Sequence, residues 1–120
     1  MPYNDDSFRR RAPRFEAPDS FYVLRGHERI QAVEISESGM RLISSDAHPF
    51  EQGERYAFKL VLADSRGVSG WEVNATCVWV RDGQAGFRFT SDPHFSRDLF
   101  ARLNRLKAVG KTTIVSGTEF

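Results

Sequence analysis

The alternation of apolar and polar positions predicts a chain built mainly from short β-strands. Alternation is clearest in Arg55–Leu62 and in Trp71–Arg81, where every second residue is apolar over most of the segment. The apolar face of the second segment consists of Trp71, Val73, Ala75, Cys77 and Trp79. Val78 and Val80 add apolar residues to the other side, so the pattern leaves the buried face near the end of this strand open.

Further strands are expected where short β-prone segments lie between turn signals. These segments are Ser20–Leu24, Glu28–Ile35, Met40–Ser44 and Ala85–Phe89. Arg25-Gly26-His27 predicts a turn between the first two, and Asp82-Gly83 predicts a tight hairpin turn before the last.

One amphipathic helix follows the strands. Its apolar positions recur at helical spacing and are Phe95, Leu99, Leu103 and Leu106. Ser91 or Asp92 is suited to cap this helix, with Pro93 in its first turn. About six short strands followed by one helix predict an all-β-dominated fold, a small six-stranded antiparallel barrel with a C-terminal helix as its lid.

The chain of 120 residues is expected to form one folded domain between two irregular ends. Residues 1–18 are polar, rich in arginine and interrupted by prolines, which predicts a flexible N-terminal arm. The barrel and its helix are expected over residues 19–107. Residues 108–120 show no periodicity and are predicted to be a disordered tail.

The net charge is only +1, so the positive charge is local, in the arm and in the helix. This distribution favours a small anionic ligand over a long nucleic-acid duplex. The chain shows no signal peptide and no apolar run of the roughly 20 residues that a membrane span needs, which predicts a cytoplasmic protein. The single Cys77 excludes an internal disulfide. We find no catalytic constellation and expect no enzyme.

Two segments carry candidate binding chemistry. The arm concentrates the guanidinium groups of Arg9, Arg10, Arg11 and Arg14. Arginine is always charged, donates through a planar fork and stacks on flat rings, which suits ligands with phosphates and purines. The turn Glu34-Ile35-Ser36-Glu37-Ser38-Gly39 adds a carboxylate, a hydroxyl group and a glycine that permits close backbone approach.

With these segments and the order of strands in view, the chain resembles a PilZ domain over roughly Ser7 to Leu106. The family carries an RxxxR motif before its barrel, which Arg10 and Arg14 supply here. It also carries a [D/N]xSxxG motif at the end of the second strand, which Ser36 and Gly39 supply. Glu34 departs from the family pattern, because Asp or Asn is usual at that position.

The resemblance implies a six-stranded antiparallel barrel that binds the bacterial second messenger cyclic di-GMP as a receptor and needs no cofactor or metal. Arg10 and Arg14 are then the main contacts to phosphates and guanines, with Arg9 and Arg11 in support. Ser36 donates to the ligand, and Glu34 accepts from a guanine. Trp79 is a candidate stacking platform, although core or rim packing is the competing interpretation of this residue.

The mechanism that follows from this reading is ordering of the arm. The ligand neutralises the arginines, the arm closes over the barrel, and an unidentified downstream protein recognises the closed state. Two alternatives stay open. In the first, the chain is a degenerate PilZ protein that serves as an adaptor without a nucleotide, and Glu34 argues for it. In the second, it is a small barrel that binds nucleic acid through its arm, and the near-neutral net charge argues against it.

Overall fold

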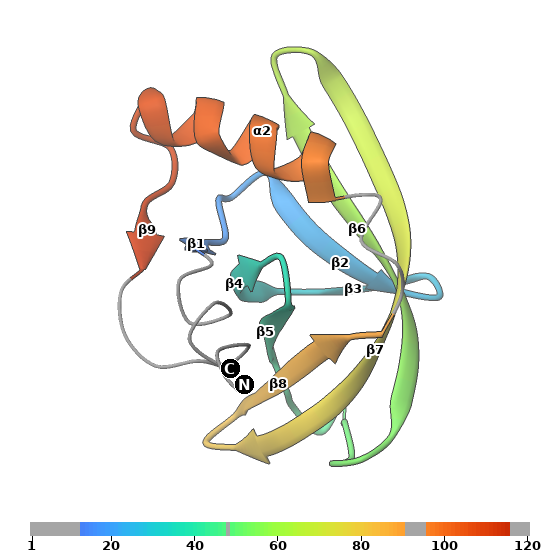
Figure 1. Cartoon of the computed structure of the whole chain (residues 1–120). Coiled ribbons are helices and arrows are strands. Elements are labelled where there is room, and N and C mark those ends of the chain that lie inside the picture. The colour runs from blue at the N-terminus through green and yellow to red at the C-terminus, as the bar shows by residue number, and fades with distance from the viewer. Residues whose placement is uncertain (1–12, 48, 91–95, 116–120) are drawn as a thin grey trace, which may run out of the picture.

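The computed structural model describes residues 13–47, 49–90 and 96–115, which form one curled antiparallel sheet and a helix (Figure 1). The strands are β1 (Arg14–Glu16), β2 (Phe21–Arg25), β3 (Glu28–Ile30), β4 (Ala32–Ser36), β5 (Gly39–Ile43), β6 (Arg55–Asp64), β7 (Gly67–Arg81), β8 (Gln84–Phe89) and β9 (Ile114–Val115). The helix is α2 (Ser96–Ala108). Their order in the sheet is β3-β2-β6-β7-β8-β5-β4-β1-β9, and this half-barrel with one C-terminal helix confirms the predicted fold class.

One predicted strand is bent into two where the chain crosses the curled sheet. Glu28–Ile35 was expected to be continuous, but Gln31 separates β3, which pairs with β2, from β4, which pairs with β5 and β1. The bend lets neighbouring residues of the chain pair with strands towards opposite ends of the curled sheet: β3 is one edge strand, and β4 lies between β5 and β1 near the other end. The Asp82-Gly83 turn forms as predicted, with φ of 54° and 76° at its two residues.

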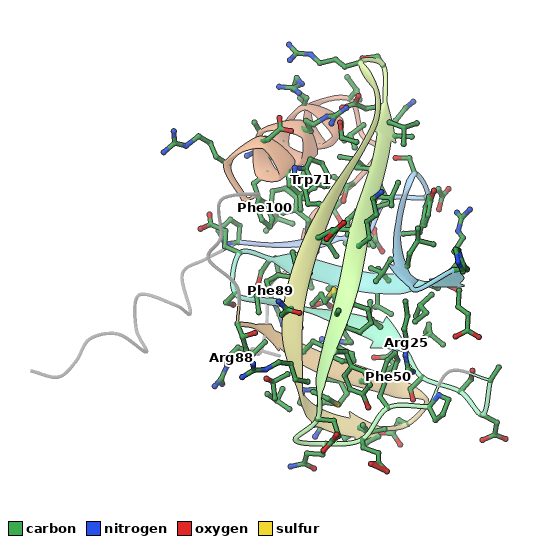
Figure 2. All side chains as sticks on the ribbon, turned by 90° about the vertical axis from the view of Figure 1, so that its right-hand side faces the viewer. Arg25, Phe50, Trp71, Arg88, Phe89 and Phe100 are labelled. Carbon is green, nitrogen blue, oxygen red and sulfur yellow. The ribbon has the colours of Figure 1, made fainter. Side chains whose placement is uncertain are left out.

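Side chains on the concave side of the sheet form a single core that the helix covers. The buried apolar residues of the helix are Leu99, Phe100, Leu103 and Leu106. Phe100 packs against Phe15 of β1, with ring centroids 5.7 Å apart. Trp71 of β7 packs against this core (Figure 2), and the guanidinium carbon of Arg102 in the helix is 5.9 Å from the centroid of its ring. The helical spacing in the sequence therefore marks the face that covers the core.

A buried ion pair joins the helix to the β6–β7 hairpin. The Nε and Nη2 groups of Arg102 each donate to one oxygen of Asp64, both at 2.7 Å. Nη2 also donates to the carbonyl oxygen of Gly67 at 3.2 Å. Hydrogen bonds from Arg102 lower the pKa of Asp64 from 3.8 to about 2. The position and orientation of α2 on the sheet thus depend on charge as well as on apolar burial.

Two short strands lie in segments that were expected to be irregular. Residues 14–16 were assigned to the flexible arm, but they form β1, and Phe15 is fully buried. Ile114 and Val115 were assigned to a disordered tail, but they form β9 and pair with β1. The hydroxyl of Thr112 donates to the carbonyl oxygen of Glu16. Strands this short show no measurable alternation, so periodicity could not detect them.

A β-bulge at Val78 corrects the expected orientation of Trp79. Cys77 lies opposite Phe87 of β8, whereas Trp79 lies opposite Gly86, and the register shifts between these two pairs. The extra residue turns Trp79 to the face opposite Cys77, so the prediction that both share one face is wrong. Cys77 is fully buried, and burial raises the pKa of its thiol. Trp79 instead lies over Gly86, on the convex side of the sheet that Arg41 also occupies.

Candidate functional site

The pairing of β1 with β4 brings the ends of the two predicted motifs together. Arg14 lies opposite Ser36, and Glu16 lies opposite Glu34. Arg14 is the arginine of the arm that belongs to the described part of the chain, whereas Arg9, Arg10 and Arg11 lie outside it. The structure therefore joins Arg14 to the turn motif and leaves the placement of the other arginines a prediction.

Glu34 is the centre of a charged cluster on the convex face. One oxygen of its carboxylate, Oε1, lies 3.4 Å from Nη1 of Arg14 and 3.2 Å from Nη2 of Arg41. Glu34 is only 7% exposed, so these two arginines, rather than water, stabilise its carboxylate. Among the described side chains, this carboxylate is thus flanked by two guanidiniums, a residue type that suits an anionic ligand.

Arg41 also belongs to this cluster, although it was not among the residues that the motifs predict. It lies in β5, outside both motifs, and pairs across the sheet with Glu34 on one side and Gly86 on the other. The available signal was the alternation of β5, in which Met40 and Leu42 are buried and Arg41 between them is not. A cationic residue between two buried residues, next to the turn motif, indicates a basic side chain on the same face as Glu34.

Ser36 and Gly39 shape the turn between β4 and β5. The hydroxyl oxygen of Ser36 accepts from the backbone N–H of Ser38 at 3.2 Å and of Gly39 at 3.3 Å. Ser36 is 1% exposed, and its hydroxyl stabilises the turn through these two hydrogen bonds. A Cβ atom on Gly39 would overlap the carbonyl oxygen of Phe87 in β8. Both residues therefore have a structural role, and a contact with a ligand stays a prediction.

Trp79 continues the same row of residues across the sheet. A Cβ atom on Gly86 would overlap the indole of Trp79, so the ring lies directly over this glycine. The guanidinium carbon of Arg81 is 4.4 Å from the centroid of the Trp79 ring, and that of Arg41 is 6.0 Å away. These contacts place Trp79 at the rim of the charged cluster and supply cation–π stabilisation.

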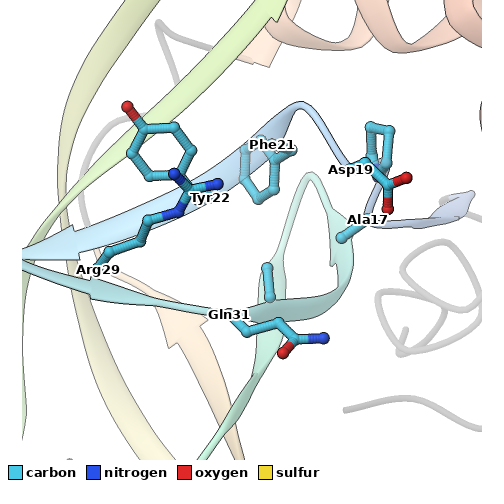
Figure 3. Close-up of a pocket in the computed structure, with 8 residues that line it drawn as sticks. Ala17, Asp19, Phe21, Tyr22, Arg29 and Gln31 are labelled. Atoms are coloured by element: carbon cyan, nitrogen blue, oxygen red, sulfur yellow. The ribbon is translucent and has the colours of Figure 1, made fainter.

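A separate pocket of about 320 Å³ lies between the β1–β2 connection and β3 (Figure 3). Arg29 stacks over the ring of Tyr22, with its guanidinium carbon 3.9 Å from the centroid, and both side chains line this pocket. Of the predicted ligand residues that the structure describes, none lines this pocket. The cluster around Glu34 is thus distinct from this pocket.

Within residues 13–47, 49–90 and 96–115, no three His, Cys, Asp or Glu side chains gather as metal ligands would. The described part of the chain likewise contains no helix that is both long and apolar enough to cross a membrane.

A family model of the PilZ domain matches residues 8–105. The chain belongs to the PilZ domain family. This family consists of ligand-binding receptor domains. A search of the curated proteins gives no match by sequence.

Solved structures of bacterial proteins share the fold of this chain. The PilZ domain of YcgR from Escherichia coli, solved with c-di-GMP, has a TM-score of 0.54 and 24% identity over 85% of this chain and 98% of that chain. The Bacillus subtilis inhibitor of motility MotI/DgrA has a TM-score of 0.65 and 16% identity over 86% of this chain and 52% of that chain. An uncharacterized Legionella protein has a TM-score of 0.63 and 19% identity over 80% of this chain and 95% of that chain.

Proposed function

We propose that this chain is a cytoplasmic receptor for cyclic di-GMP. The observation that carries the proposal is the pairing of β1 with β4, which sets Arg14 of the RxxxR motif beside Glu34 and Ser36 of the turn motif. Membership of the PilZ family and the likeness to the c-di-GMP-bound domain of YcgR support the choice of ligand.

Each site residue has a task that its chemistry allows. Arg10 and Arg14 donate to phosphates and to the O6 and N7 acceptors of guanine, and Arg9 and Arg11 add charge. Ser36 and Gly39 keep the turn close to the ligand. Trp79 stacks on a guanine, an interaction of about 1–3 kcal/mol for each base. Arg81 lies over the Trp79 ring, so stacking requires Arg81 to move aside or to stack on the base itself.

The second part of the proposal concerns signalling. Arg14 lies in β1 and is already paired with Glu34, so the part of the site that belongs to the barrel exists before the ligand arrives. Residues 5–13 carry the other arginines, and we propose that the ligand orders them over the barrel. The ordered arm then offers a protein partner a surface that the free protein lacks.

Calorimetric titration of cyclic di-GMP into the protein tests the proposal, with cyclic di-AMP and single-stranded RNA as controls. We expect heat and saturation with cyclic di-GMP alone, and strong weakening in Arg10→Ala. Amide exchange across residues 5–13 is expected to slow in the complex. Equal exchange with and without ligand contradicts the ordering of the arm but not the binding.

An adaptor without a nucleotide is the second candidate, and one observation favours it. The carboxylate of Glu34 already neutralises part of the charge of Arg14 and Arg41, so the cluster is stable without any ligand. No heat at high micromolar cyclic di-GMP, from a protein that melts cooperatively, would refute the receptor function and favour this alternative.

A further inference from the structure

Arg41 lies between Glu34 and Trp79 on the face of the sheet where the ligand is proposed to bind. In the sheet, the row of paired residues runs from Glu34 through Arg41 and Gly86 to Trp79. The guanidinium of Arg41 thus stands between the carboxylate at 3.2 Å and the indole centroid at 6.0 Å. A cyclic dinucleotide that contacts both Arg14 and Trp79 therefore spans Arg41.

The three guanidinium nitrogens of Arg41 have different surroundings. Nη2 donates to Oε1 of Glu34, and Nε is buried without a hydrogen-bond partner in the described part of the chain. The side chain is 23% exposed, which leaves Nη1 as the nitrogen that a ligand reaches. A single free N–H₂ group acts as a point donor and suits a phosphate oxygen better than the paired acceptors of guanine, which require the full fork.

The ion pair with Glu34 lowers the conformational entropy that Arg41 loses when it donates to a ligand. A long arginine side chain normally loses rotamer freedom when it binds a ligand. The ion pair with Glu34 has already restricted this side chain on the sheet surface, so less freedom remains to be lost.

We propose that Arg41 is a ligand-binding residue and that its Nη1 group donates to a phosphate of the cyclic dinucleotide. The inference rests on the proposed function and extends the site beyond the two motifs, onto β5. It makes Glu34 a positioning residue for Arg41 as well as for Arg14.

The test is calorimetric titration of cyclic di-GMP into the wild-type chain, Arg41→Gln, Arg41→Lys and the control Arg66→Gln. Arg66 is exposed at the β6–β7 turn, far from β5 in Figure 1, and its substitution removes the same charge. We expect Arg41→Gln to weaken binding about tenfold, which is typical of a lost charge-assisted hydrogen bond. Arg41→Lys should stay within about threefold of the wild type, because lysine binds phosphate as a point charge. Arg66→Gln should bind as the wild type does.

Each other outcome overturns a defined part of the inference. Wild-type affinity in Arg41→Gln removes Arg41 from the site while the receptor function stands. Equal weakening in Arg41→Lys and Arg41→Gln rejects the phosphate contact, because it shows that the planar fork is needed. If Arg41→Gln melts at a lower temperature, the lysine variant decides the question. A wild-type protein that gives no heat refutes the proposed function, and Arg41 with it.

Discussion

Replacement of Asp64 by Asn should loosen helix α2 from the β6–β7 hairpin. Asp64 accepts two hydrogen bonds of 2.7 Å from Arg102, and the two side chains are only 6% and 5% exposed. Asn keeps the shape and the oxygen that accepts from the backbone N–H of Arg66, but it removes the charge. Arg102 is then left buried at the helix–sheet junction without its counterion.

The lowered pKa of Asp64 sets the scale of the effect. A fall from 3.8 to about 2 corresponds to roughly 2 kcal/mol of stabilisation of the folded state, at about 1.4 kcal/mol per pKa unit. Because the ion pair lies at the edge of the helix–sheet junction, screening by solvent reduces this stabilisation to about 1–2 kcal/mol. The unpaired guanidinium adds a desolvation cost, so we expect a total loss of about 2–3 kcal/mol. For a domain of this size the melting temperature should fall by about 10 °C.

The same pair predicts how stability depends on pH. Because the folded-state pKa of Asp64 is depressed, its contribution is complete above the unfolded value near 3.8 and is lost as the pH falls towards about 2. Between these limits the difference in stability between the wild type and Asp64→Asn should shrink. A constant difference across this window would show that the pair does not titrate as the hydrogen bonds require.

The assay is thermal and urea unfolding, with Asp98→Asn as the matched control. Asp98 lies in the first turn of α2, 4.0 Å from Arg102, but its side chain is 62% exposed. Exposed pairs of this kind contribute a few tenths of a kcal/mol, so the control should change little. Equal losses in the two variants would refute the argument that buried pairing fixes the helix. Affinity for cyclic di-GMP should be unchanged in Asp64→Asn below its melting temperature.

Further substitutions test the turn motif. Gly39→Ala should cost at least about 2 kcal/mol of unfolding free energy, because the new Cβ meets a backbone carbonyl of β8 that cannot rotate away. Gly26→Ala is its control in denaturant unfolding: it meets open space at a φ of +63° and should cost about 1 kcal/mol, so equal losses would contradict the clash. In titrations with cyclic di-GMP, we expect Glu34→Asp to bind more weakly than the wild type and Glu34→Ala more weakly still, because a shorter side chain restrains Arg14 and Arg41 less. No change in either variant would remove Glu34 from the site.

The parts of the fold with a repeating pattern could be predicted from the sequence. Alternation located β6 and most of β7, because one face of each strand is buried over many residues. Helical spacing located α2, and Asp82-Gly83 located the β7–β8 turn, because positive φ at both positions favours these residue types. These features are local, so the sequence alone carries them.

The remaining features depend on neighbours that the sequence does not place. The bulge at Val78 inserts one residue into a long alternating segment, and only the register with β8 shows that Trp79 turns outward. β1 and β9 form because they complete one edge of the sheet, with Phe15 buried beneath the helix. Arg41 joins the site because β5 lies next to β4. The sequence motifs identified Arg14 and Glu34, and the pairing of β4 with β5 adds Arg41 to them.

The departure at Glu34 follows from this placement. β4 lies between β1 and β5, and the arginines that meet Glu34 come from these two flanking strands. One carboxylate oxygen has to reach both guanidiniums from the central strand, and the additional methylene of Glu extends that reach. A shorter Asp would face a wider gap to at least one of them and would leave that arginine less restrained. Glu at this position is therefore explained by the arginine on β5, and the two residues are expected to act together in setting how strongly an anionic ligand competes for Arg14.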